Sequence, residues 1–133
     1  MMMHKVATAF AALLLISGTA SAQGAKLNDA QIAHIAYTAG LADIANAQQA
    51  LKISKNKDVR AFAKDMARDH KAVNDKALAL VKKLKVTPQD NDTSKAIAKG
   101  QADKRVDLAK LKGAAFDQAY INNEVAYHKT VTG

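Results

Sequence analysis

The sequence predicts an all-α protein built as an antiparallel bundle of four helices. Its composition disfavours sheet, with one proline, three tyrosines, three phenylalanines and no tryptophan in 133 residues. A long helical period runs through residues 56–85. The polar connection at 54–57 is so short that the helix before it and the helix after it must be antiparallel.

Residues 56–85 carry the clearest helical pattern of the chain. Apolar side chains recur there at steps of three and four, which places them on one stripe at about 100° per residue. The stripe consists of Val59, Phe62, Met66, His70, Val73, Ala77, Leu80 and Leu84. Because His70 lies within this apolar row, it is either a hydrogen-bonded core residue or part of a buried site.

The first 22 residues have the pattern of a secretory signal peptide. A short basic start, Met1–Lys5, precedes the apolar run Val6–Ile16, and Ala20-Ser21-Ala22 forms a cleavage pattern. An apolar run of about eleven residues is too short to span about 30 Å of hydrocarbon. The sequence therefore predicts export with cleavage before Gln23, which leaves residues 23–133 as one helical-bundle domain.

Caps and breaks divide this domain into helices at about 28–54, 57–85, 94–111 and 115–131. Asn28 is placed to cap the first helix and Gln31 to complete a capping box. Pro88 ends the second helix, and Gly113 is expected to stop the third. Because only about five turns follow Gly113, we expect the last two helices to cover the hairpin together, a second copy of the chain to supply a missing helix, or the chain to be truncated at its C-terminus.

Composition and motifs exclude several classes of function. The chain has no cysteine, so it has no disulfide, thiolate metal site or cysteine nucleophile, and it has neither a G-x-S-x-G elbow nor a phosphate-binding loop. Lys and Arg outnumber Asp and Glu by 20 to 12, a net charge of +8 that favours acidic partners. Nucleic acid is disfavoured, because the basic residues are dispersed without interleaved aromatic residues and the chain is expected to be exported.

The basic segment 76–85 has two interpretations. As an amphipathic segment it would lie on an anionic surface of the cell envelope. As an ordinary helix end it would be solvated, with its cations stabilised by the helix dipole.

Two segments share a layout of an aromatic residue, a potential ligand and a histidine at successive i, i+4 steps. They are Phe62-Met66-His70 and Tyr120-Glu124-His128. Facing helices bring such residues together, as in bundles that bind metal ions. The candidate ligands of a divalent metal ion are Asp43, Asp69, His70, Glu124 and His128.

Alternatives remain for these residues. Both histidines could instead be hydrogen-bonded bundle residues without a cofactor, paired with a carboxylate. Asp43 lies in the row of Ile32 and Ala39, so it either faces inward or sits at the wet edge of that row. His34 is expected to be solvated, and the tyrosines are expected to pack with their hydroxyl groups in water.

Several motifs together resemble the exported bacterial family known as domain of unknown function 4142. They are Gly40-Leu41-Ala42-Asp43, then Val59-Arg60-Ala61-Phe62-Ala63 with Met66 and Asp69-His70, then Gly113-Ala114-Ala115-Phe116-Asp117 with Ala119-Tyr120 and His128. The resemblance covers essentially the whole mature chain and implies a ferritin-like four-helix bundle in the periplasm or cell envelope, without an established activity.

The chain departs from the pattern of that family in three places. The family pattern has a glutamate at Asp43, a methionine at Glu124 and a final helix beyond His128. The first two differences change candidate ligands of any metal site. The third bears on whether the chain folds on its own. From sequence we expect a non-enzymatic binding or envelope-associated domain, with metal binding and anionic-lipid binding as the alternatives.

Overall fold

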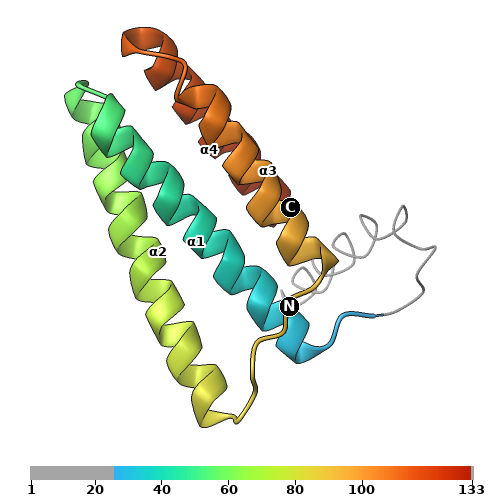
Figure 1. Ribbon diagram of the computed structural model, residues 1–133. Coiled ribbons are helices and arrows are strands. Elements are labelled where there is room, and N and C mark those ends of the chain that lie inside the picture. Colours follow the sequence, from blue (N-terminus) through green and yellow to red (C-terminus); the bar gives the residue numbers. More distant parts are fainter. Residues whose placement is uncertain (1–25, 133) are drawn as a thin grey trace, which may run out of the picture.

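The computed structural model describes residues 26–132, which contain four helices and no strand (Figure 1). The helices are α1 (Asp29–Ile53), α2 (Lys57–Lys83), α3 (Asp92–Leu108) and α4 (Gly113–Thr132). The predicted all-α helical bundle is confirmed. The predicted signal peptide, residues 1–22, lies outside the described part of the chain. Within residues 26–132, no helix combines the length and the apolar character needed to cross a membrane.

Asparagine caps begin the first three helices. The side chain of Asn28 accepts from the backbone N–H of Gln31, whose side chain accepts from the backbone N–H of Asn28, which is the predicted capping box. Asn56 caps α2, and Asn91 caps α3 in a second capping box. These bonds satisfy N–H groups that have no partner within the helix, so each helix begins at a defined residue.

The break between α3 and α4 differs from the prediction. α3 begins at Asp92 and ends at Leu108, so the helix expected at 94–111 is displaced toward the N-terminus. Gly113 does not stop α3. It is the first residue of α4 and has a φ of 56°, a left-handed conformation that glycine adopts without the steric cost of a Cβ atom. The turn at 109–112 therefore ends α3, which is the role that was expected of Gly113.

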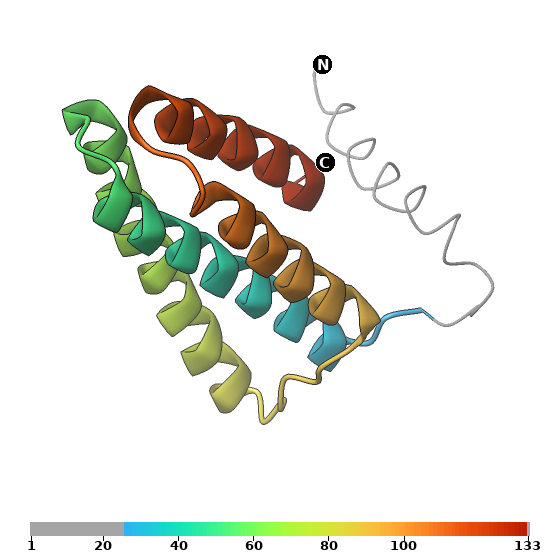
Figure 2. The same ribbon diagram turned by 45° about the horizontal axis from the view of Figure 1, so that its top comes forward.

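α1 is the central helix of the bundle, since it contacts each of the other three. α2 returns antiparallel to α1, α3 runs parallel to α1, and α4 returns antiparallel to α3 (Figures 1 and 2). The segment between α2 and α3 crosses the start of α1, where the backbone N–H of Gln89 donates to the carbonyl of Ala30 at 2.9 Å. This topology brings the middle of α1 between α2 and α4.

The apolar core lies toward the end of the bundle that holds the α1–α2 and α3–α4 connections. Its buried members are Ala47, Ala50, Ala63, Leu108, Phe116 and Tyr120. Small alanines on α1 and α2 let the helices approach closely, and the rings of Phe116 and Tyr120 stack with centroids 6.1 Å apart. The hydroxyl of Ser54 donates to Asp117 at 2.6 Å and fastens α4 to the α1–α2 connection.

Candidate metal centre

Asp43 lies in the middle of α1 and is completely buried. The inward orientation is therefore the correct one of the two that the sequence left open. Burying a carboxylate without compensating partners is costly, because the charge loses its hydration. The groups around Asp43 must compensate for this loss of hydration.

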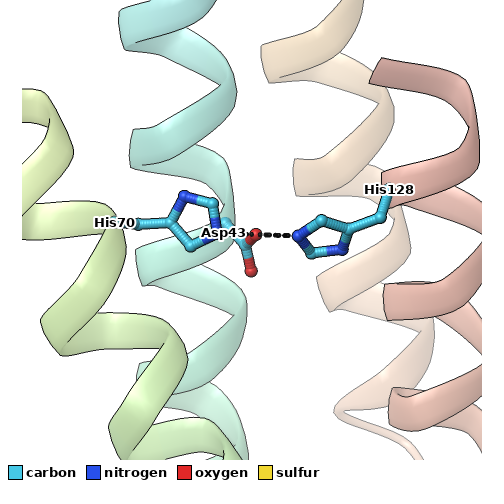
Figure 3. Close-up of side chains that lie close together, drawn as sticks. All are labelled: Asp43, His70 and His128. Carbon is cyan, nitrogen blue, oxygen red and sulfur yellow. Dashed lines mark ion pairs between the residues drawn. The ribbon is translucent and has the colours of Figure 1, made fainter. Parts of the chain in front are cut away.

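His70 from α2 and His128 from α4 converge on Asp43 from opposite sides (Figure 3). Nε2 of His70 lies 2.7 Å from Oδ2 of Asp43, and Nε2 of His128 lies 3.0 Å from the same oxygen. The two imidazole centroids are 5.7 Å apart. Eight residues earlier on each helix, about two turns, the rings of Phe62 and Tyr120 meet edge to face with centroids 6.1 Å apart. The two segments with the shared layout thus face each other, as their spacing predicted.

The hydrogen bond of the second ring nitrogen, Nδ1, determines the tautomer of His128. Nδ1 lies 2.8 Å from the backbone carbonyl oxygen of Glu124, four residues earlier on α4. Because a carbonyl oxygen only accepts hydrogen bonds, Nδ1 carries the proton and donates it. In the neutral ring Nε2 then has a free lone pair, and this lone pair lies next to the carboxylate of Asp43.

Neither carboxylate oxygen of Asp43 has an aligned nitrogen donor, although both Nε2 atoms lie within 3.0 Å of Oδ2. The neighbouring carboxyl of Glu124 is a donor to Asp43 when it is protonated. The short distances between Nε2 and Oδ2 are therefore close approaches of ligand-type atoms rather than well-formed hydrogen bonds. Two electron-rich atoms at such a distance repel each other unless a cation, either a proton or a metal ion, lies with them.

Asp43, His70 and His128 each offer one ligand atom, and these atoms lie within 4.8 Å of one another. A metal ion bound at about 2.0–2.1 Å by imidazole nitrogen and carboxylate oxygen separates neighbouring ligand atoms by about 3.0–3.4 Å. The separation of 3.0 Å between Oδ2 and Nε2 of His128 is at the lower end of that range, and the separation of 2.7 Å from Nε2 of His70 is shorter, so a bound ion requires a small outward shift of the His70 ring. The histidine side chains are 28% and 34% exposed, so a metal ion and water can reach the site from the surface.

Glu124 lies beside this group of three. Its side chain is buried, and Oε2 is 3.7 Å from Nδ1 of His128. Burial, reinforced by the facing carboxyl of Asp43, raises the pKa of Glu124 to about 9, while the amide of Asn46, at 3.4 Å from Oε1, acts in the opposite direction. Glu124 is therefore neutral near pH 7 and able to share its proton with Asp43.

A polar network that the sequence analysis did not predict supports the buried carboxyls. Nδ2 of Asn46 donates to Gln101 at 2.9 Å, and the guanidinium of Arg105 donates to Oδ1 of Asn46 at 2.8 Å. Asn123 also donates to Gln101, at 3.1 Å. The buried asparagine thus links α1 with α3 and α4. The available signal was Asn46 itself, a polar residue within an apolar row of α1.

The structure corrects three expectations about individual residues. Asp69 is not part of the site: its side chain is 57% exposed and pairs with Arg68 at 2.9 Å. The hydroxyl groups of Tyr120 and Tyr127 are not in water, since both residues are buried and the hydroxyl of Tyr127 donates to the carbonyl of Ala39 at 2.7 Å. Burial raises the pKa of both phenols. His34 is partly covered and lies 3.5 Å from Asp90.

Comparison with known proteins gives the family of the chain. No curated protein and no solved structure matches it. A family model described as a domain of unknown function, DUF4142, matches residues 16–133. The match includes every helix and all the residues of the site. The chain therefore belongs to the DUF4142 family.

Proposed function

We propose that this protein is an exported, non-enzymatic helical bundle that binds a divalent transition-metal ion through Asp43, His70 and His128. The observation that carries the proposal is the orientation of His128. Its Nδ1–H donates to the carbonyl of Glu124 and its Nε2 lies beside the carboxylate of Asp43, which has no aligned nitrogen donor. Histidines that bind metal ions characteristically donate the other ring N–H to a carbonyl or carboxylate in this manner.

The chemistry of the ligands limits the kind of metal ion. Two imidazole nitrogens and one carboxylate suit zinc, iron, nickel or copper better than magnesium or calcium, which prefer oxygen ligands. Three protein ligands leave at least one coordination position for water or a small anion. Glu124, next to Asp43, is available to accept or give up a proton when the ion binds.

Isothermal titration of the chelator-treated protein with Zn²⁺ tests the proposal, together with elemental analysis of protein purified without chelator. We expect one ion per chain, and His70→Ala or His128→Ala should weaken binding by at least about 100-fold. His34→Ala is the matched histidine control and should bind like the parent protein. Asp43→Asn should lose binding, whereas Asp69→Asn should keep it.

The absence of stoichiometric metal under both conditions would contradict the proposal. So would equal affinity in the His34 and His70 variants, because binding would then come from scattered surface groups.

Export is supported by the sequence pattern of residues 1–22. N-terminal sequencing of protein recovered from the extracytoplasmic fraction tests it, and the first residue should be Gln23. Recovery of an uncleaved chain from the cytoplasm would contradict it.

A further inference from the structure

The apolar stripe of α2 is covered in its first half and uncovered in its second. Phe62 and Met66 pack against the core. Farther along the same stripe Val73, Leu80 and Leu84 are 61%, 56% and 61% exposed. A helix normally buries its apolar face, so an exposed continuation of that face indicates an additional contact.

The exposed half of the stripe lies where α1 and α2 extend past the described part of α4. Beyond the level of the Asp43 carboxylate, α1 continues to Asp29 and α2 continues to Lys83, which is about 20 Å for each at 1.5 Å per residue. In the same direction the described part of α4, from His128 to Thr132, covers about 6 Å. Both ribbon views show the C-terminal end of α2 standing apart from α4 (Figures 1 and 2).

Uncompensated positive charge surrounds this exposed stripe. Lys76, Lys82, Lys83 and Lys85 are all exposed. Within residues 26–132 the lysines that form ion pairs are others, namely Lys71, Lys95, Lys99 and Lys110. Asp75 is the one acidic residue between 71 and 86, and its Oδ2 forms an ion pair with Nζ of Lys71 at 2.7 Å. Lys76 and Lys83 are seven residues apart and therefore form a row directly beside the stripe.

We propose that the lysine-flanked stripe, defined as Val73, Lys76, Leu80, Lys83 and Leu84 with the adjoining Lys82 and Lys85, binds the anionic surface of a lipid bilayer. Aliphatic side chains at the acyl boundary with lysines reaching the phosphate groups are the pattern of an interfacial helix. This site is separate from the metal centre and does not depend on it.

Charge and size favour lipid over a protein partner. A second copy of the chain would bring the same lysine row against this one, and like charges repel. The exposed large apolar side chains of this half of α2 are Val73, Leu78, Leu80 and Leu84, few for a stable protein interface, to which each partner contributes about 20–30 residues. A lipid surface needs no matching shape. The helix dipole explains the presence of Lys82 and Lys83 in the last turn of α2. It does not explain Lys76, which lies two turns earlier, or the exposed leucines.

Vesicle sedimentation tests the proposal with phosphatidylcholine vesicles and with vesicles that also contain phosphatidylglycerol. We expect binding to the anionic vesicles that weakens as salt rises. The double variant Lys76→Gln, Lys83→Gln should reduce the partition coefficient about 25-fold, since each lysine near an anionic surface contributes about fivefold. Leu80→Ser, Leu84→Ser should reduce it as well, and circular dichroism checks that both variants are folded.

The matched control is Lys64→Gln, Lys104→Gln, which removes the same charge from exposed lysines elsewhere on the bundle. It should retain most of the binding. An equal loss in this control would overturn the proposal, because attraction would then follow net charge alone. Equal binding to neutral vesicles would also overturn the proposal. So would light scattering that shows a dimer in the parent protein and a monomer in the Leu80→Ser, Leu84→Ser variant, because the stripe would then be an interface between two copies.

Discussion

The side chain of Asn74 on α2 packs directly against Gly40 on α1. A Cβ atom on Gly40 would lie 2.3 Å from Oδ1 of Asn74, whose Nδ2 donates to the carbonyl of Tyr37 at 3.2 Å. Gly40 is one turn from Asp43 and Asn74 is one turn from His70. The contact therefore fixes the spacing of the two helices next to the metal centre.

Gly40→Ala should destabilise the fold by about 1–3 kcal/mol, because the added methyl group displaces a buried, hydrogen-bonded amide. It should also weaken Zn²⁺ binding by moving His70 away from Asp43. Urea unfolding and isothermal titration measure the two effects. Gly100→Ala is the control: nothing lies within 4 Å of its added Cβ atom, so it should stabilise α3 by about 0.5–1 kcal/mol. Equal effects of the two changes would contradict this prediction.

Glu124 should make the metal-free protein less stable as the pH rises. Its pKa is raised from an ordinary value of 4.5 to about 9, so the folded protein keeps a proton that the unfolded chain releases. The stability contributed by this proton is complete below pH 4.5, declines with rising pH and is lost above about pH 9.

Urea unfolding in the presence of a chelator, measured at several pH values between these limits, tests this dependence. Glu124→Gln should flatten it, because the amide remains neutral throughout. The exposed carboxylate of Asp69 gives the control, and Asp69→Asn should leave the slope unchanged. An unaltered slope in Glu124→Gln would show that another group causes it.

Local patterns predicted much of the fold and part of the site. The capping box at Asn28 and the break at Pro88 depend on neighbouring residues, and the shared i, i+4 layout depends on helical geometry alone, so sequence was sufficient for them. Asp69 could have been excluded on the same basis. Successive residues in a helix point about 100° apart, so Asp69 cannot share the direction of His70 toward the site.

Contacts between helices were beyond sequence reasoning. Asn46 bonds to Gln101, Arg105 and Glu124, which are far from it in the chain, so no local spacing indicates these partners. The start of α4 at Gly113 was missed for a related reason. A glycine with positive φ can either end one helix or begin the next, and the local sequence does not distinguish the two.

Phe116 should be among the most sensitive positions for folding. Its ring is fully buried in a small core and stacks on Tyr120. Phe116→Ala should cost about 3–5 kcal/mol, from lost burial and the cavity that remains. Val106→Ala is the control, since Val106 is 62% exposed and its loss should change the free energy of unfolding by less than about 0.5 kcal/mol. Thermal or urea unfolding distinguishes them, and similar costs would mean that the core lies elsewhere.

Metal binding should raise the stability of the folded protein, because the unfolded chain does not hold Asp43, His70 and His128 together. For a ligand at 100 times its dissociation constant the gain is about 2.7 kcal/mol. Thermal unfolding with and without Zn²⁺ should therefore show an increase in Tm that a chelator reverses. The increase should disappear in His128→Ala and persist in His34→Ala, whose ring lies beside Asp90 instead. If Zn²⁺ raised the Tm of both variants equally, the stabilising ion would be bound outside the three-residue centre.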